Sequence, residues 1–134
     1  MRAALILSLL LALPAMAQDK NAAPLDAAGF DQFTRGRVMD HYDGGALYGA
    51  EQYLPGRRVI WQDGEGCMRG HWSDTPEGLI CFDYEGQETR WCWSYRPDAE
   101  GGLAAHLEGD TGGAPILLKP RPGRLSCPDL EPAA

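Results

Sequence analysis

The chain has 134 residues, with 12 Lys and Arg against 19 Asp and Glu and a net charge of −7. Its length fits one domain. Its Gly content, about 13%, and its Pro content, about 7%, exceed the usual shares of about 7% and 5%. That excess argues against a helical bundle and for short elements joined by turns. The acidic charge argues against nucleic acid or an anionic membrane surface as the main partner.

The first 17 residues have the three parts of a secretory signal peptide. Arg2 supplies a positive end, residues 3–13 form an apolar run, and Ala15-Met16-Ala17 is an A-x-A cleavage site. The run is too short to cross a bilayer core of about 30 Å as a helix. We expect cleavage after Ala17, a periplasmic or secreted mature chain with a net charge of −8, and no membrane span after cleavage. An uncleaved anchor is the alternative.

The mature chain is predicted to have a disordered lead, a single β-domain and a Pro-rich tail: residues 18–24, 25–119 and 120–134. At the start of the domain, residues 25–35 indicate one short helix. Asp26 is its expected N-cap, and Gly36 lies just beyond its end.

From residue 37 onward, the pattern is typical of short strands separated by Gly- and Pro-rich turns. The expected strands are residues 37–42, 47–54, 57–62, 67–72, 79–85, 90–95, 102–108 and 115–119. The connections are too short for crossovers, so successive strands pair as an antiparallel meander. The sequence therefore predicts an all-β domain of about eight strands, either a small barrel or a strongly curved open sheet with the helix on one face.

A turn at Gly86-Gln87 is expected to set the register of the central hairpin. If these two residues form a type II′ turn, residues whose numbers sum to 173 lie opposite each other, including Cys81 and Cys92. One face of the hairpin then carries Ile80, Phe82, Tyr84, Trp91, Trp93 and Tyr95. The preceding strands extend this face with Val59, Trp61, Met68, Gly70 and Trp72.

This aromatic face has two interpretations. It is a hydrophobic core, as in most small β-domains, because aromatic side chains bury roughly 150–250 Å² each. Alternatively, its tryptophans line a cavity for one apolar ligand. The four Trp in the chain are more than such a core needs, which keeps the second interpretation open.

Four cysteines in an exported chain indicate two disulfides. The predicted register favours Cys81–Cys92, which leaves Cys67–Cys127 to pin the tail to the sheet. No Cys-x-x-Cys or similar close pair is present, which argues against a redox centre or a zinc site.

The sequence gives little support for catalysis. Its histidines are dispersed and form no metal-binding motif: His41, His71 and His106. No G-x-S-x-G motif is present, and the many carboxylates are those of any acidic chain. We therefore predict no catalytic residue, no metal and no cofactor.

Residues 48–61 are the segment richest in distinctive side chains. As a simple hairpin, it would pack Tyr48 against Trp61 and turn at Pro55-Gly56. As a recognition patch, it would place Glu51 near Arg57 or Arg58, in a charged rim around Tyr53. The full candidate ligand or partner surface is Tyr48, Glu51, Tyr53, Arg57, Arg58, Trp61, Trp72, Trp91 and Trp93.

Several motifs together resemble small uncharacterised exported proteins of alphaproteobacteria. They are residues 48–61 (YGAEQYLPGRRVIW), Gly66-Cys67, Gly70-His71-Trp72, Ile80-Cys81-Phe82 with Tyr84, and Cys92-Trp93. The resemblance covers residues 33–127. It implies a periplasmic or secreted β-protein with paired cysteines, and it implies no activity and no site residue.

We therefore expect a monomeric, non-enzymatic binding or accessory domain, whose partner is a protein or a small apolar ligand. One alternative is an inhibitor of a secreted enzyme, since a rigid scaffold lowers the ordering cost of binding. Another is a small-ligand carrier of lipocalin-like type. An enzyme is the least favoured interpretation.

Overall fold

The computed structural model describes residues 23–110 and 112–130. The predicted signal peptide and most of the predicted disordered lead lie outside these residues. The elements are α1 (Ala27–Thr34), β1 (Val38–Asp43), β2 (Ala46–Tyr53), the 3-10 helix η1 (Pro55–Arg57), β3 (Arg58–Asp63), β4 (Gly66–Asp74), β5 (Ile80–Tyr84), β6 (Trp91–Pro97), β7 (Leu103–Leu107), β8 (Ile116–Arg121) and the 3-10 helix η2 (Pro128–Leu130).

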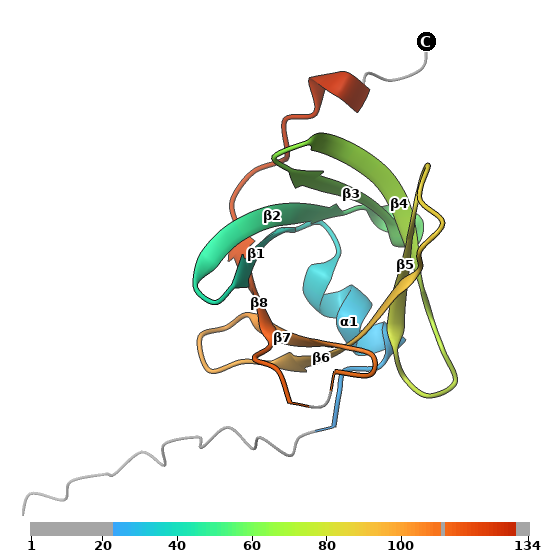
Figure 1. Ribbon diagram of the computed structural model, residues 1–134, viewed down its shortest axis with the longest axis vertical. Helices are drawn as coiled ribbons and strands as arrows, with labels where there is room; N and C mark the ends of the chain where they lie inside the picture. The colour runs from blue at the N-terminus through green and yellow to red at the C-terminus, as the bar shows by residue number, and fades with distance from the viewer. Residues whose placement is uncertain (1–22, 111, 131–134) are drawn as a thin grey trace, which may run out of the picture.

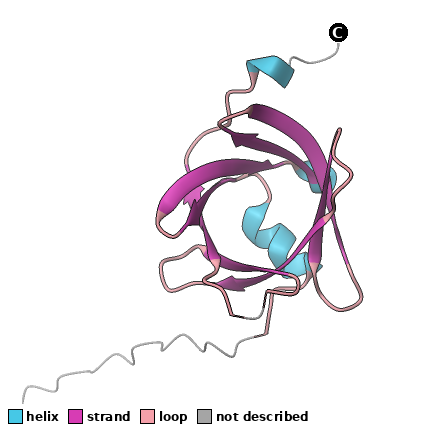
Figure 2. Cartoon of the chain, in the orientation of Figure 1, coloured by secondary structure: helices cyan, strands magenta, loops and turns pink. Residues whose placement is uncertain are grey.

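The eight strands form a closed barrel in which each strand pairs antiparallel with its neighbours along the chain (Figures 1 and 2). Pairing of β1 with β8 closes it, from Val38 opposite Arg121 to Tyr42 opposite Leu117. The predicted all-β meander is confirmed, and of the two predicted forms the structure is the barrel. Closure removes the exposed sheet edges that an open sheet would leave.

The central hairpin has the predicted register but not the predicted turn. Cys81 lies opposite Cys92. However, the amide of Gln87 donates to the carbonyl of Tyr84 at 3.1 Å, so the turn is centred on Glu85-Gly86 rather than on Gly86-Gln87. Gly86 has φ of +78° and supplies the positive φ at the second central position. Residues 87–90, which have no regular secondary structure, connect this turn to β6, and the pairing of β5 with β6 keeps the predicted register.

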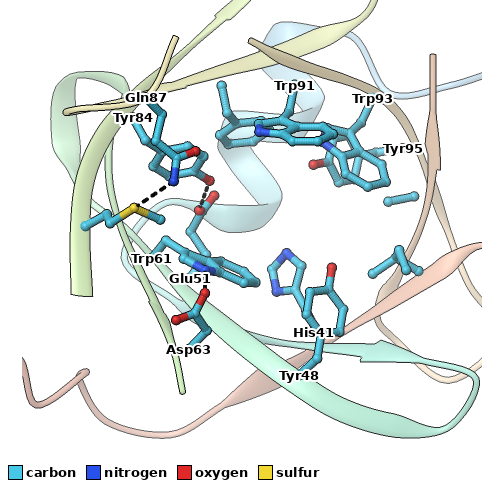
Figure 3. A pocket seen from close by; sticks show the side chains of 14 residues that line it. His41, Tyr48, Glu51, Trp61, Asp63, Tyr84, Gln87, Trp91, Trp93 and Tyr95 are labelled. Atoms are coloured by element: carbon cyan, nitrogen blue, oxygen red, sulfur yellow. Dashed lines mark hydrogen bonds between the residues drawn. The ribbon is translucent and has the colours of Figure 1, made fainter. Parts of the chain in front are cut away.

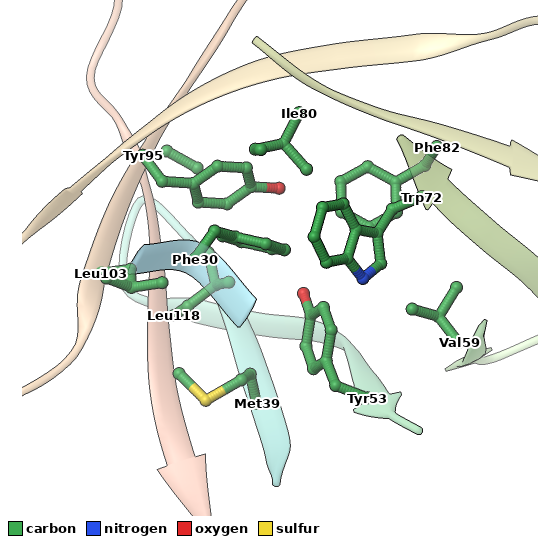
Figure 4. Packing of buried hydrophobic residues seen from close by; sticks show 11 residues of the cluster. Phe30, Met39, Tyr53, Val59, Trp72, Ile80, Phe82, Tyr95, Leu103 and Leu118 are labelled. Atoms are coloured by element: carbon green, nitrogen blue, oxygen red, sulfur yellow. The ribbon is translucent and has the colours of Figure 1, made fainter. Parts of the chain in front are cut away.

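Helix α1 closes one end of the barrel. Asp26 is its N-cap, as predicted, and accepts a hydrogen bond from the Gly29 amide at 2.8 Å. The helix inserts Phe30 into the barrel, where the ring is fully buried. Its centroid lies 4.6 Å from that of Tyr95 and 5.2 Å from that of Trp72 (Figure 4). A packed aromatic core therefore fills this end of the barrel.

Both predicted disulfides are present, Cys81–Cys92 and Cys67–Cys127. The second holds the C-terminal segment against the β3–β4 hairpin. There the Cys67 amide donates to Asp129 Oδ2 at 3.0 Å, and Arg69 Nη2 donates to the Leu130 carbonyl at 2.7 Å. The predicted tail is thus pinned, although its first two residues belong to β8. In the part of the chain that the structure describes, no helix is long and apolar enough to span a membrane.

Candidate ligand-binding cavity

A cavity of about 300 Å³ lies at the end of the barrel opposite α1. Every strand contributes to its wall, the odd strands near their C-terminal ends and the even strands near their N-terminal ends. These ends meet at one rim because the barrel is an antiparallel meander. Phe82 and Tyr95 belong both to the core and to the cavity wall. The packed core is therefore the floor of the cavity.

The walls of the cavity are largely aromatic. Trp91 and Trp93 of β6 lie on one side, and Trp61 of β3 and Tyr48 of β2 lie across from them (Figure 3). The rings of Tyr48 and Trp61 pack at a tilt, with centroids 5.7 Å apart, as the simple-hairpin interpretation of residues 48–61 predicts. Tyr48 is 42% exposed and Trp91 is 41% exposed. The cavity therefore opens to solvent beside these two rings.

Two glycines inside strands leave room for the side chains of Trp61 and Tyr84. A Cβ on Gly49 would lie 2.2 Å from Cζ2 of Trp61, and a Cβ on Gly70 would lie 2.7 Å from Cδ1 of Tyr84. Either distance is a severe clash. Glycine in a strand interior is otherwise unfavourable, and it marks a close approach of this kind.

A β-bulge accounts for the orientation of Tyr48. In the pairing of β1 with β2, His41 lies opposite Gly49 and Tyr42 lies opposite Leu47, so Tyr48 has no opposite residue. An extra residue of this kind redirects its side chain. Tyr48 and Glu51 both line the cavity, although they are three residues apart and strict alternation would put them on opposite faces.

Glu51 is the buried polar group of the cavity. Its side chain is 2% exposed, and the hydroxyl of Tyr84 donates a hydrogen bond to its Oε2 (Figure 3). Burial raises the pKa of Glu51 to about 8, and the hydrogen bond from Tyr84 opposes this shift only in part. The carboxyl group is therefore mainly protonated and uncharged at neutral pH.

His41 is uncharged at neutral pH for the same physical reason. Its Nδ1 lies 3.0 Å from the carbonyl of Met39, and burial lowers its pKa to about 4. Because a carbonyl only accepts, Nδ1 carries the proton and Nε2 is left as an acceptor. The imidazole meets the ring of Trp61 edge to face, with centroids 5.0 Å apart.

Apart from His41 and the tyrosines, the ionisable side chains among the described residues of the wall are carboxyl groups. Glu51 and Asp63 line the cavity, whereas no Lys or Arg does. Asp63 Oδ2 accepts a hydrogen bond of 2.8 Å from Trp61 Nε1, which fixes that indole in the wall. No group of three or more His, Cys, Asp or Glu side chains in the described ranges is placed to hold a metal ion.

The nine residues of the predicted ligand or partner surface do not all lie together in the structure. Five of its nine residues line the cavity: Tyr48, Glu51, Trp61, Trp91 and Trp93. Tyr53 and Trp72 are instead buried in the core beside α1. The aromatic face is therefore packed core at the end of the barrel beside α1 and cavity wall at the other end.

The predicted charged rim around Tyr53 is wrong. Glu51 and Tyr53 both point into the barrel, whereas Arg57 and Arg58 are exposed. Arg57 pairs with Asp74 at 2.8 Å, and Arg58 donates to a backbone carbonyl of its own turn. The prediction failed because it treated the hairpin as a surface element, whereas in a closed barrel every second residue faces inward.

Sequence reasoning missed five residues of the cavity: His41, Asp63, Gln87, Ala105 and Ile116. Strand alternation places Met68, which also lines the cavity, on the aromatic face, but it gives no signal for the loop residue Gln87. The other two histidines lie elsewhere. His71 lies outside the cavity with its Nε2 3.7 Å from Asp83 Oδ2, and His106 lies opposite Ser94.

Comparison with family models, with curated proteins and with solved structures finds no match for this chain. The fold and the site by themselves define a class: a closed eight-stranded up-and-down barrel, with a helix closing one end and an aromatic cavity at the other.

Proposed function

We propose that the protein binds one small, mainly apolar molecule in this cavity, as a non-enzymatic carrier or binding protein of lipocalin-like type. The observation that carries the proposal is the hollow end of the barrel. A barrel of eight strands is just wide enough to be filled by side chains or to hold one small ligand. Here side chains fill one half of the interior, and the other half is open.

The cavity has the usual chemistry of a small-molecule site. Such sites are largely apolar and preformed, with a few convergent polar groups that orient the ligand. Tryptophan rings supply the apolar surface here, and the carboxyl group of Glu51 and Nε2 of His41 supply polar atoms. His41 bonds a backbone carbonyl rather than a carboxylate, which supports binding over catalysis by a His–carboxylate pair.

The proposal includes export from the cytoplasm. The two disulfides fit an oxidising, extracytoplasmic compartment. We propose that residues 1–17 direct the chain there and are removed after Ala17. Intact-mass measurement of the exported chain tests this step, because retention of residues 1–17 would contradict it.

A neutral fluorescent probe, N-phenyl-1-naphthylamine, tests the binding function. Its emission increases in an apolar site, so titration with the protein should give saturable enhancement at one site per chain. Ile116→Trp should abolish this enhancement, because Ile116 lines the cavity and the larger ring would fill it.

Leu117→Trp is the matched control, since the neighbouring residue of β8 points to the outside of the barrel. Circular dichroism would establish that both variants fold. Equal enhancement by the two variants would place the probe outside the cavity and contradict the proposal.

A further inference from the structure

We propose that the ligand is an organic cation, a small molecule with an alkylated ammonium group held among the tryptophan rings, with Glu51 and Asp63 as its counter-charges. This inference rests on the proposed binding function and specifies its ligand class. Three features of the cavity support it.

The first feature is the arrangement of rings. Trp91 and Trp93 face Trp61 and Tyr48 across the cavity (Figure 3). The faces of aromatic rings are electronegative and attract cations, with indole the strongest, and cages of such rings bind quaternary ammonium groups. An apolar ligand needs only apolar surface, whereas several indoles around one small space favour a cation in particular.

The second feature is that the cavity wall offers counter-charges for a cation and none for an anion. The ionisable carboxyl groups of the wall are Glu51 and Asp63, and no Lys or Arg in the described residues accompanies them. Nearby cationic side chains have partners outside the cavity: Arg121 pairs with Asp40 at 3.1 Å, and Arg90 pairs with Asp83 at 2.9 Å. A buried anionic ligand would have no counter-charge, and burial of an unpaired charge is costly.

The third feature is that Glu51 can change its charge when a cation arrives. Burial keeps it protonated at neutral pH, with a pKa of about 8. A cation beside the carboxyl group favours the carboxylate, so binding should release a proton and should strengthen as the pH rises through 8.

The imidazole and phenol groups that face Glu51 do not contribute to this dependence of binding on pH. They are His41, Tyr48, Tyr53, Tyr84 and Tyr95, with Asp63 adding a second carboxyl group to the wall. The pKa of His41 is lowered to about 4, and that of Tyr48 is raised to about 12. Burial also raises the pKa values of the three other tyrosines well above 10. None of these imidazole and phenol groups therefore changes charge between pH 7 and 9.

Three probes of the same shape and different charge test the inference. Phenyltrimethylammonium, tert-butylbenzene and benzenesulfonate each carry a tetrahedral group on one phenyl ring, and their charges are positive, neutral and negative. Titrations followed by tryptophan fluorescence at pH 8.5 should show the cation binding at least tenfold more tightly than the neutral probe, and the anion binding most weakly. If the neutral probe or the anion binds as tightly as the cation, the inference is wrong while the binding function stands. If the folded protein binds none of the three, both fail.

A variant of Glu51 makes the test specific to the carboxyl group. Glu51→Gln keeps the size and an acceptor for Tyr84 but cannot ionise. We expect it to reduce the affinity for phenyltrimethylammonium at pH 8.5 about tenfold more than the affinity for tert-butylbenzene, and to remove the rise in affinity for the cation between pH 7 and 9. Glu77→Gln makes the same charge change at an exposed turn of the closed end and should have no effect. Equal effects of the two variants on the cation would contradict the inference.

Discussion

The hydroxyl of Tyr84 donates a hydrogen bond to Oε2 of Glu51, and this bond joins β5 to β2 across the open half of the barrel. Gly70 lies opposite Tyr84 in the neighbouring strand β4 and leaves space for its ring. The carboxyl group of Glu51 and the phenol of Tyr84 thus form one side of the cavity, and Gly70 behind the phenol makes room for it.

Tyr84→Phe should lower stability and raise the pKa of Glu51 above about 8, because the bond it removes favours the carboxylate. Loss of a partner by a buried polar group costs about 1–3 kcal/mol. Denaturant unfolding at pH 7 checks this value. Tyr42→Phe is the matched control, because the Tyr42 ring lies against Lys119 in partly exposed surroundings. Equal losses for the two variants would show that the buried bond contributes nothing.

Gly49→Ala should displace the ring of Trp61 and disturb the cavity. The added methyl group would overlap the indole, and overpacking of a buried site costs about 1–3 kcal/mol. We expect that loss in denaturant unfolding, together with weaker enhancement of N-phenyl-1-naphthylamine. Gly64→Ala is the matched control, because this glycine lies in the turn between β3 and β4 and its added methyl group would meet no atom within 4 Å. Unchanged probe binding in Gly49→Ala would contradict the role assigned to Gly49.

The contribution of Glu51 to the stability of the barrel should fall as the pH rises from 4.5 to 8. Burial raises its pKa from 4.5 to about 8, so between these values the folded chain holds a proton that the unfolded chain has lost. Raising the pH therefore favours unfolding. Glu51→Gln cannot ionise and lacks this effect, so its stability should rise relative to that of the wild type across that range, by about 5 kcal/mol in total.

Denaturant unfolding of both proteins between pH 4 and 9 measures this difference. His41 acts in the opposite direction in both of them, because its lowered pKa makes stability fall as the pH drops from 6.5 to about 4. The difference between wild type and variant cancels that contribution. A difference that stays constant with pH would show that Glu51 ionises normally.

The two disulfides should differ in their contribution to stability. Cys67–Cys127 spans 60 residues and Cys81–Cys92 spans 11. The chain-entropy relation gives losses of about 4 and about 3 kcal/mol when each is replaced by a pair of serines. Denaturant unfolding of the two double variants checks the order. A larger loss for the Cys81–Cys92 replacement would indicate that strain or unfolded-state structure outweighs loop length.

Much of the fold could be predicted from the sequence because its signals are local. Period-two alternation and Gly-rich turns located all eight strands, and the spacing of Cys81 and Cys92 was consistent with a facing pair. The form of the turn at Gly86 was not predictable, since a positive φ suits more than one turn position.

The cavity was predictable only in part. The number of tryptophans and their position on one face of the strands indicated a cavity. However, alternation alone does not say which end of a barrel is filled by side chains. Phe30 of α1 decides that, through contacts with Tyr95 and Trp72 that are distant in sequence. The buried state of Glu51 likewise depends on closure of the barrel, and a hairpin considered alone would leave that side chain exposed.

The indole N–H signals of the four tryptophans test the central claim most directly. Trp61, Trp91 and Trp93 line the cavity, whereas Trp72 is buried in the core at the closed end. NMR spectra of the labelled protein, assigned with single Trp→Phe variants, would be recorded during titration with phenyltrimethylammonium. We predict saturable shifts of the three cavity signals and little change in that of Trp72. No shift, or shifts that spare the three cavity signals, would contradict a ligand site in the open end of the barrel.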